Sequence, residues 1–380
     1  MQPAKRIIGL FPGFLGVGGV QEASRQTATA LDAIAKENGW RTRFLALNDP
    51  PGDGRFAWGG SEVSFRGFGR AKIPFVLSAA ILRWGNTRIV LAAHPNLALP
   101  AACVKAFSSP LRMIVMAHGV EVWSPLSAVR RRALLCADLV LAPSSDTAKK
   151  LVAVQGIPSQ RTRRLPWILS PNLVHMAEAP ALLPLPHDFP KGSVILTVAR
   201  WAASERYKGA DDLIRATAQL RTAVPDLHLV VVGSGDDIPR LRELASDIGA
   251  HDRVHFLEGL SQEELGACYA HADVFALPST GEGFGLVFLE AMAFARPIVA
   301  AAAGGSTDLV EDGVNGLLIP PGDQPALAKA LQGLLADDSL RVALGQRGAE
   351  IVRGKYRFDL FQSQLATILA SCGLDSLPPR

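Results

Sequence analysis

Short runs of β-branched and other apolar residues alternate with segments of helical period along the whole sequence. The first half contains RIIGLF, TRFLAL, TRIVLAA, RMIVMAH and DLVLAPS, and the second half repeats the pattern from SVILTVAR to NGLLIPPG. Strands that are separated by helices pair in parallel, because the crossover between parallel strands is usually a helix. The sequence therefore predicts an α/β protein with parallel sheets and crossover helices.

A proline-rich segment without a convincing period, residues 170–192, separates the two halves of this pattern. We expect two Rossmann-like, doubly wound domains that face each other across a cleft. Residues 1–172 are the predicted N-terminal domain, 173–191 the linker and 192–354 the C-terminal domain, while 355–380 are expected to form a helix that packs back on the N-terminal domain. Because open α/β sheets bind ligands at the carboxyl ends of their strands, the cleft is the expected site.

The composition is that of an ordinary globular protein. The chain has 380 residues, of which 48% are hydrophobic and 19% charged, and this excludes a disordered, collagen-like or coiled-coil protein. Its four cysteines lie far apart without CxxC or CxxH spacing, so neither a disulfide framework nor a zinc site is predicted, and a reducing cytoplasm fits best. The apolar stretches are shorter than the ~20 residues that span a bilayer, and the N-terminus is interpreted as a first strand instead of an export signal.

The net charge of +4 hides a difference between the two halves. Residues 1–190 contain 22 Lys and Arg against 11 Asp and Glu, which leaves the second half acidic. Two arginine clusters lie in the basic half: Arg130, Arg131 and Arg132, and Arg161, Arg163 and Arg164. Such clusters suit a phosphorylated ligand or an anionic membrane surface, and a solvated helix face is the alternative. Interleaved aromatic residues that stack nucleic-acid bases are missing, so no nucleic-acid partner is predicted.

A glycine-rich turn follows the first predicted strand. Gly16, Gly18 and Gly19 lie between RIIGLF and a helical segment over residues 20–35. Glycine lets the backbone approach a diphosphate, and a helix N-terminus adds free N–H donors and partial positive charge. The GxGxxG fingerprint of dinucleotide-binding proteins is not met, and a tight turn without a ligand is the alternative. Gly233, after the run LHLVVV, has the same two interpretations.

The strongest signal is PSTGEGFGLVFLEAMAFARPIVAAAAGG, residues 278–305. Glu282 lies in its glycine-rich turn, and Glu290 lies two turns into the helix that follows. The turn leaves N–H groups accessible to a phosphate or sugar oxygen, and each carboxylate can accept hydrogen bonds from two neighbouring hydroxyls. Paired hydroxyls indicate a sugar or a ribose.

This segment resembles the donor-site signature of the retaining GT-B glycosyltransferases of family four, PSxxEGFGLxxLEAMAxGxPVVA, in which seven residues separate two glutamates. The resemblance covers essentially the whole chain. It implies that the protein moves a sugar from a UDP- or GDP-linked donor to an acceptor hydroxyl, with retention at the anomeric carbon. It also implies that Glu290 holds the ribose hydroxyls and Glu282 the hydroxyls of the sugar.

The same resemblance implies the other site residues. Arg200 in ILTVAR and Lys208 in ERYKG resemble the basic pair that holds the donor diphosphate, where two cations stabilise the leaving group without a metal. Gly18 and Gly19 resemble the glycine loop of the N-terminal domain. His118, in MAHGVEVW, resembles the HG element near the reacting sugar and is expected to orient that sugar and support the transition state. The remaining expected donor-binding residues are Gly233, Leu257, Gly283, Phe284, Gly285 and Leu286.

Two positions depart from the pattern of the family. Ala295 replaces the usual glycine, which is expected to change only the packing at a helix end, and Asp308 replaces the usual glutamate, which leaves the donor open. His94 and His175 are expected to be packing residues. Because no Asp-x-Asp motif is present, the reaction is expected to need neither a metal nor a cofactor.

The sequence leaves several alternatives open. An NAD-dependent dehydrogenase or a nucleotide-sugar epimerase would also use doubly wound domains, and a non-catalytic module would bind a nucleotide sugar without consuming it. The acceptor is a glycan, a lipid-linked sugar or a small molecule. The basic half favours an anionic acceptor at the inner membrane face, in envelope polysaccharide or glycolipid synthesis, and a soluble acceptor is the alternative. The oligomeric state is not defined.

Overall fold

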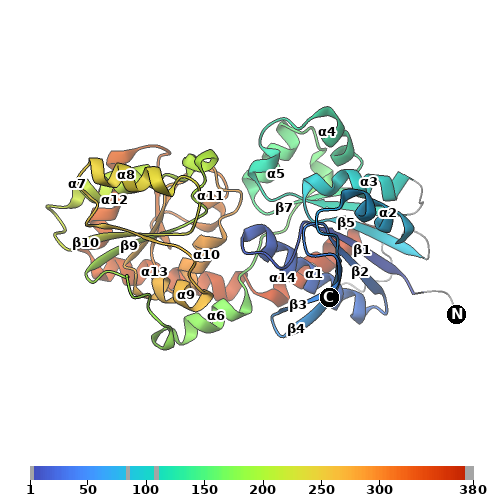
Figure 1. The fold of residues 1–380 in the computed structure, drawn as a ribbon, viewed down its shortest axis with the longest axis horizontal. Coiled ribbons are helices and arrows are strands. Elements are labelled where there is room, and N and C mark those ends of the chain that lie inside the picture. The colour runs from blue at the N-terminus through green and yellow to red at the C-terminus, as the bar shows by residue number, and fades with distance from the viewer. Residues whose placement is uncertain (1–3, 83–85, 107–110, 373–380) are drawn as a thin grey trace. The chain divides into compact units, whose positions relative to one another are not determined.

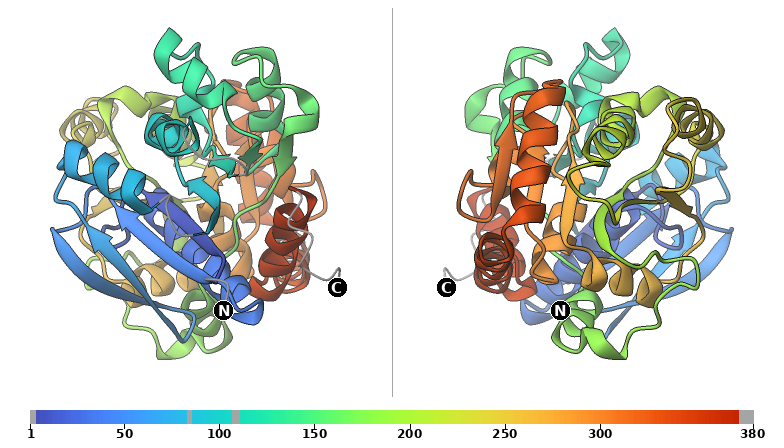
Figure 2. Two further views of the ribbon diagram at one scale, coloured as in Figure 1. Left: turned by 90° about the vertical axis from the view of Figure 1, so that its right-hand side faces the viewer. Right: turned by 90° about the vertical axis from the view of Figure 1, so that its left-hand side faces the viewer.

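The computed structural model describes residues 4–82, 86–106 and 111–372. The chain forms two compact units: unit 1 comprises Met1–Pro171 with Arg357–Arg380, and unit 2 comprises Asn172–Tyr356. Each unit is built on its own sheet of mainly parallel strands, with helices on both faces (Figures 1 and 2). This confirms the predicted α/β fold class.

The segment predicted as a linker, residues 173–191, contains regular structure. It lies in unit 2 and includes part of helix α6 (Pro171–Glu178) and a 3-10 helix (Pro180–Leu182) that packs against helix α9 (Gln262–His271). A proline at the first position of a helix lacks only an N–H group that would have no partner there. Pro171 and Pro180 therefore begin helices in a segment that the sequence analysis expected to be an irregular linker.

The C-terminal helix is part of unit 1. Helix α14 (Phe358–Ser371) packs beside helix α1 (Gly19–Glu37) (Figure 1). Residues 373–380, the end of the predicted C-terminal segment, lie outside the described residues.

Unit 2 contains a six-stranded parallel sheet with the order β11-β10-β9-β12-β13-β14. The strands are β9 (Ser193–Val198), β10 (Leu227–Val232), β11 (Val254–Leu257), β12 (Val274–Leu277), β13 (Ile298–Ala301) and β14 (Gly316–Ile319). The other helices are α7 (Ala210–Leu220), α8 (Ile238–Asp247), α10 (Leu286–Ala293), α11 (Ser306–Leu309), α12 (Gln324–Ala336) and α13 (Asp338–Lys355). Each strand coincides with a predicted apolar run. The strand order reverses between β9 and β12, so loops from these two strands separate there and leave room for a ligand.

Unit 1 contains an eight-stranded sheet with the order β3-β4-β2-β1-β5-β6-β7-β8. The strands are β1 (Arg6–Phe11), β2 (Arg41–Ala46), β3 (Gly52–Trp58), β4 (Ser61–Gly67), β5 (Thr87–Ala92), β6 (Arg112–Met116), β7 (Leu139–Ala142) and β8 (Thr162–Arg164). Besides α1 and α14, the helices are α2 (Lys72–Leu82), α3 (Ala98–Ala106), α4 (Ala128–Leu135) and α5 (Ser145–Ala153). The strand order reverses between β1 and β5, which is the corresponding ligand-binding position in this sheet.

The hairpin β3–β4 was not predicted. Its strands are antiparallel and are joined by Gly59 and Gly60, both with positive φ (55° and 77°). Such a Gly-Gly pair suits the two-residue turns that match the twist of a hairpin, and alternate side chains of both strands are buried. The signal was therefore present as a Gly-Gly pair between two alternating segments. Phe56 and Phe65 of the hairpin pack against Phe14, with ring centroids 4.6 and 5.0 Å away.

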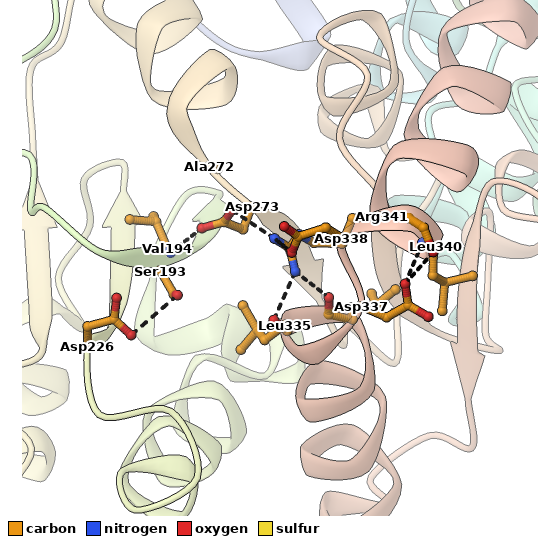
Figure 3. A network of polar contacts seen from close by, with 12 residues as sticks. Ser193, Val194, Asp226, Ala272, Asp273, Leu335, Asp337, Asp338, Leu340 and Arg341 are labelled. Atoms are coloured by element: carbon orange, nitrogen blue, oxygen red, sulfur yellow. Dashed lines mark hydrogen bonds and ion pairs between the residues drawn. The ribbon is translucent and has the colours of Figure 1, made fainter.

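A polar network joins the amino ends of β9 and β12 to the turn between α12 and α13 (Figure 3). Asp273 accepts a hydrogen bond from the backbone N–H of Val194 at 2.8 Å and lies 3.6 Å from the guanidinium group of Arg341. Arg341 donates to the carbonyl oxygens of Leu334 and Leu335 at 2.7 and 2.9 Å. Carbonyls at a helix end lack helical partners, so Arg341 caps α12 and holds it to the sheet edge opposite the carboxyl ends.

The end of α10 corrects the expectation for Ala295. This residue has φ 55°, in the left-handed region, and follows the C-cap of the helix. The backbone N–H groups of Ala295 and Arg296 donate to Met292 and Ala291, the hydrogen-bond pattern of a Schellman motif. Alanine in place of glycine therefore strains the backbone at this position, by roughly 1 kcal/mol, and does not only change packing.

Helix α13 packs closely against this helix end. A Cβ atom on Gly345 would overlap the carbonyl oxygen of Ala295, whereas a Cβ atom on Gly333 of α12 would meet no atom within 4 Å. We predict that Gly345→Ala lowers the free energy of unfolding by about 1–3 kcal/mol, because α13 must move away from α10. The matched change Gly333→Ala should raise it by roughly 0.5–1 kcal/mol through helix propensity. Denaturant titration followed by circular dichroism measures both, and equal effects of the two variants would contradict the packing argument.

Candidate functional site

In unit 2, the loops that follow β9 and β12 lie against each other at the carboxyl edge of the sheet. The backbone N–H of Thr280 donates to the carbonyl oxygen of Tyr207 at 2.9 Å. Gly209, with φ 80°, is the N-cap residue of α7, and a Cβ atom there would lie 2.8 Å from the ring of Pro278. The contact between the two loops brings Arg200 and Lys208 from one together with Glu282 from the other.

The charged side chains of these loops are paired. Lys208 Nζ lies 3.2 Å from Glu282 Oε1 and 3.9 Å from Glu205 Oε2, while Arg200 forms an ion pair with the other oxygen of Glu205. The side chains of Lys208, Glu205 and Glu282 are only 12–15% exposed, but that of Arg200 is 71% exposed. Glu205 was not predicted as a site residue, although it stands in the ERYKG segment. It connects the two cations and keeps them within reach of one anionic ligand.

Tyr207 lies within the same group of charges. Burial of its hydroxyl raises its pKa, and the negative charge of Glu282 raises it further, while Arg200 acts in the opposite direction. The phenol therefore stays neutral and retains its proton as a hydrogen-bond donor.

The glycine-rich turn between β12 and α10 packs on the loop after β13. The backbone N–H of Gly305 donates to the carbonyl oxygen of Glu282 at 2.7 Å, and a Cβ atom on Gly305 would lie 2.6 Å from the Cα of Phe284. Phe284 is buried, and Gly285, with φ 93°, precedes the first residue of α10, Leu286. Gly283 completes the turn that carries Glu282. The predicted donor-binding residues 283–286 thus occupy the turn and the N-terminus of α10.

Glu290 points toward helix α9. Its Oε2 accepts a hydrogen bond from the hydroxyl of Tyr269 at 2.7 Å. Tyr269 is fully buried, and burial together with the charge of Glu290 raises its pKa well above the usual value. Its ring stacks on Phe294 and packs against Phe275. Sequence reasoning missed Tyr269, because a single aromatic residue in a helix suggests only core packing.

The predicted residues Gly233 and Leu257 lie side by side at the carboxyl ends of β10 and β11. The backbone N–H of Gly233 donates to the carbonyl oxygen of Leu257 at 3.0 Å. A Cβ atom on Gly233 would overlap the carbonyl oxygen of Ala199, and one on Gly235 would overlap that of Trp201. These glycines therefore allow the loop after β10 to pack directly on the loop that carries Arg200.

The acidic residues near this site are held by arginines. Arg240 donates to both oxygens of Asp211 at 2.7 Å and also to Asp237, which lies 3.3 Å from Arg206. The hydrogen bond from Arg240 lowers the pKa of Asp237 against the opposing effect of desolvation. In the described parts of the chain, no group of three or more His, Cys, Asp and Glu side chains is arranged to hold a metal ion. Asp237 therefore contacts both Arg240 and the loop residue Arg206, whereas Asp211 contacts Arg240.

In unit 1, a series of polar contacts fixes the loop that contains Gly16, Gly18 and Gly19. Trp58 Nε1 donates to Glu22 at 2.6 Å, and Glu22 pairs with Arg25 at 2.7 Å. Arg25 in turn donates to the carbonyl oxygens of Phe14 and Gly16 at 2.6 and 3.1 Å.

The exposed part of this loop contains Gly18 and Gly19. Gly18 has φ 137°, and Gly19 is the first residue of α1. Both are exposed, and so are Leu15 and Val17. The structure therefore presents the loop backbone at the carboxyl end of β1, where the strand order reverses.

His118 follows β6 and is held between two rings. Its ring lies 5.2 Å from that of His94 and 5.3 Å from that of Trp167. Its Nε2 lies 2.7 Å from the carbonyl oxygen of Ala93, and its backbone N–H donates to Glu121 at 2.6 Å. A carbonyl can only accept, so Nε2 carries the proton, and Nδ1 of the neutral ring is the acceptor that remains.

His94 packs against His118 and also caps the short 3-10 helix that follows it, Pro95–Leu97. It follows β5 as His118 follows the adjacent strand β6, so the shared position after two strands was a signal in the sequence. Its Nδ1 accepts a hydrogen bond from the backbone N–H of Asn96. Burial, and then the neighbouring His118, lowers the pKa of His94 to about 4, so it is neutral near pH 7. His175 was also expected to pack, but its side chain is 85% exposed and lies 3.4 Å from Glu178.

Comparison with protein families identifies both halves of the chain. Residues 17–167 match the family described as Glycosyltransferase Family 4, and residues 187–351 match Glycosyl transferases group 1. A GDP-mannose-dependent alpha-(1-6)-phosphatidylinositol monomannoside mannosyltransferase from Mycolicibacterium smegmatis is 33% identical over 271 residues, which cover 68% of this chain and 70% of that protein.

Solved structures show the same fold. Sucrose-phosphate synthase from Thermosynechococcus elongatus superposes with a TM-score of 0.76 at 24% identity, covering 97% of this chain and 98% of that one. Anabaena HepE in complex with UDP superposes with a TM-score of 0.72 at 21% identity, covering 97% and 100%. The architecture of both units is thus that of known glycosyltransferase structures.

We predict that Tyr269→Phe weakens the binding of a nucleoside diphosphate several-fold. The variant keeps the ring in the core but removes the hydrogen bond that orients Glu290, a bond to a charged group worth about 1.5–3 kcal/mol. Titration calorimetry with GDP and UDP measures the affinity, and circular dichroism verifies that the variant is folded. Affinity equal to that of the unchanged protein would show that Tyr269 does not position Glu290 for the ligand.

Proposed function

This chain belongs to the family-four, group 1 glycosyltransferases, and from this we propose that it transfers a sugar from a nucleoside diphosphate donor to an acceptor hydroxyl with retention at the anomeric carbon. The observation that carries the proposal is the group of Lys208, Glu205, Glu282 and Arg200 where the strand order of unit 2 reverses. It combines two cations for a diphosphate with a carboxylate for sugar hydroxyls.

Arg200 and Lys208 bind the diphosphate in this proposal. Both are now paired with Glu205, and a diphosphate with two negative charges competes with that single carboxylate for them. The exposed guanidinium of Arg200 can turn toward the ligand, while the nearly buried Lys208 remains beside Glu282. As the glycosidic bond breaks, negative charge develops on the departing phosphate, and fixed cations stabilise it.

The two glutamates have separate roles. Glu282 accepts hydrogen bonds from the sugar, and its pairing with Lys208 orients the carboxylate. Glu290, oriented by Tyr269, accepts hydrogen bonds from the ribose. Neither acts as a nucleophile in this proposal: the departing phosphate takes the proton of the acceptor on the same face of the sugar, which accounts for retention.

In this proposal, unit 1 supplies further groups that bind the reacting sugar and the diphosphate. His118, clamped between His94 and Trp167, offers Nδ1 as an acceptor for a sugar hydroxyl. The loop at Gly18 and Gly19 offers backbone N–H groups to the diphosphate. These roles orient the substrate and need no change in the protonation of His118.

The acceptor proposed here is anionic, in the synthesis of an envelope polysaccharide or glycolipid. The name of the mycobacterial relative describes transfer to a phosphatidylinositol monomannoside, and the N-terminal half of this chain is basic. Arg130, Arg131 and Arg132 lie on α4 with exposed side chains, although Arg131 donates to the carbonyl oxygen of Gln155 at 2.8 Å. The donor is a GDP- or UDP-sugar, because the same relative is named for GDP-mannose and HepE was solved with UDP.

We predict different effects for the two glutamates. Glu282→Ala should lower kcat about 100-fold or more while GDP and UDP still bind, because the lost hydrogen bonds are to the sugar in transfer. Glu290→Gln should weaken the binding of the bare nucleotide by about 1–3 kcal/mol. A screen of nucleotide sugars for thermal stabilisation identifies the donor, and turnover and titration are then measured with it.

Glu263→Ala is the matched control for these variants, because Glu263 is exposed on α9. Its turnover and nucleotide affinity should equal those of the unchanged protein. Unchanged turnover in Glu282→Ala would remove Glu282 from the site. Nucleotide affinity that is unaffected in Glu290→Gln would refute the ribose role.

We also predict that activity persists in excess EDTA. Arg200 and Lys208 provide the positive charge that a divalent cation supplies in metal-dependent transferases. Turnover is measured with and without EDTA, and the EDTA-treated enzyme is measured again after magnesium is restored. Loss of activity that magnesium restores would show that the two cations are insufficient.

A further inference from the structure

A buried carboxylate in unit 1 has no role in the proposed reaction as described so far. Asp49 follows β2 and is 5% exposed. Its Oδ2 accepts a hydrogen bond from the backbone N–H of Phe14 at 2.7 Å, and its Oδ1 accepts one from that of Leu15 at 3.2 Å. Within the described residues, Asp49 forms no ion pair with Lys or Arg. A carboxylate with so little exposure is unfavourable unless its oxygens accept hydrogen bonds, and here two consecutive N–H groups provide them.

The backbone of Asp49 is held by its neighbours. The preceding residue, Asn48, donates its N–H to the carbonyl oxygen of Pro12 at 2.8 Å, so the chain after β2 continues beside the chain after β1. The carbonyl oxygen of Asp49 accepts a hydrogen bond from the N–H of Gly69 at 2.7 Å. A Cβ atom on Gly13 would lie 2.9 Å from Asp49 Oδ1. The carboxylate therefore lies directly against the backbone that follows β1.

One peptide group is held between Asp49 and Arg25. Its carbonyl oxygen, from Phe14, accepts a hydrogen bond from Arg25 at 2.6 Å, and its N–H, from Leu15, donates to Asp49. In a trans peptide group these two atoms point in opposite directions, so the two side chains contact the group from opposite sides. This fixes the orientation of the backbone that leads into the glycine loop, residues 16–19.

The same geometry determines where a loop donor points. Arg25 also donates to the carbonyl oxygen of Gly16 at 3.1 Å. The N–H of that peptide group belongs to Val17 and points away from Arg25. Val17 is fully exposed, and the next residue, Gly18, has φ 137°. The orientation of the exposed loop donors therefore depends on the peptide groups that precede them.

We propose that Asp49 is a positioning residue for the donor diphosphate. It contacts no substrate atom. Together with Arg25 it orients the glycine loop, whose N–H groups bind the diphosphate. A loop that is already ordered loses less conformational entropy when its ligand binds. The inference rests on the proposed function for the role of the diphosphate, whereas the order of the loop is measurable without a ligand.

Hydrogen–deuterium exchange of the nucleotide-free protein is the first test. In Asp49→Ala, peptides that contain residues 13–19 should exchange about tenfold faster, because the N–H groups of Phe14 and Leu15 lose their acceptor. Exchange in the strands of both sheets should not change. An unaltered exchange rate in the loop would overturn the proposal.

Asp49→Asn is a second variant that preserves the size of the side chain. Its amide keeps one oxygen as an acceptor but turns an NH2 group, which cannot accept, toward the other backbone N–H. Loop exchange should therefore be intermediate between that of the unchanged protein and that of Asp49→Ala. Circular dichroism verifies that each variant is folded, and Asp49→Asn provides the test if Asp49→Ala does not fold.

Nucleotide titration tests the link between the loop and the ligand. Asp49→Asn should weaken the binding of GDP or UDP about fivefold, and the KM for the donor should rise by a similar factor. The value of kcat should fall by less, because the groups that bind the sugar in the proposed function are unchanged. Unchanged nucleotide affinity would overturn the positioning role, even if loop exchange were faster.

Asp138→Asn is the matched control. Asp138 precedes β7 at the amino edge of the same sheet, and its carboxylate accepts a hydrogen bond from the backbone N–H of Met113 at 2.8 Å. The control should destabilise unit 1 without changing loop exchange or nucleotide affinity. Equal losses of nucleotide affinity in the Asp49 and Asp138 variants would indicate a general effect of stability and contradict the positioning role.

The inference and the proposed function fail in different ways. If the unchanged protein binds neither GDP nor UDP and transfers no sugar, the proposed function is wrong, and the diphosphate role of the loop is wrong with it. If the unchanged protein binds a nucleotide and transfers sugar, but the Asp49 variants bind that nucleotide equally well, the proposed function stands and the inference alone is wrong.

Discussion

Both units depend on the same constraint, the reversal of strand order within a parallel sheet. Parallel strands end at one edge, and crossover helices that leave in opposite directions separate two adjacent loops at that edge. In unit 2 these loops follow β9 and β12 and carry Arg200, Lys208 and Glu282. In unit 1 the reversal lies between β1 and β5, so the glycine loop and His94 lie at that edge, and His118 follows the next strand, β6. The strand order therefore determines which loops, and hence which residues, lie close together at the carboxyl edge of each sheet.

The charged side chains of the candidate site in unit 2 are held in pairs. Each glutamate that the sequence identified is oriented by a partner on another element: Glu282 by Lys208 and Glu290 by Tyr269. A carboxylate with low exposure would be unfavourable without such a partner. The pairing orients the carboxylates, and in our proposal an entering diphosphate replaces Glu205 as the partner of Arg200 and Lys208.

In unit 1, packing of aromatic side chains orients the glycine loop and His118. The hairpin β3–β4 supports Phe14 at the base of the glycine loop, and Trp58 of that hairpin begins the polar chain that ends on the loop carbonyls. His118 is confined by His94 and Trp167 and by one carbonyl oxygen. No helix of the described residues is long and apolar enough to cross a bilayer.

The sequence by itself determined the α/β class, the strands of unit 2 and the glycine-rich turn before α10 that carries Glu282, because continuous apolar runs and such a turn are local properties. The hairpin β3–β4 was missed, since its strands are only half-buried, although its Gly-Gly turn was readable. The residues that contact the candidate site residues could be identified only from the tertiary structure. Glu205, Tyr269, His94 and Trp167 acquire their roles from hydrogen bonds and ring contacts between separate elements, and these depend on how the elements pack. Ala295 gave no signal of strain for the same reason: its positive φ is imposed by the helix end that packs against α13.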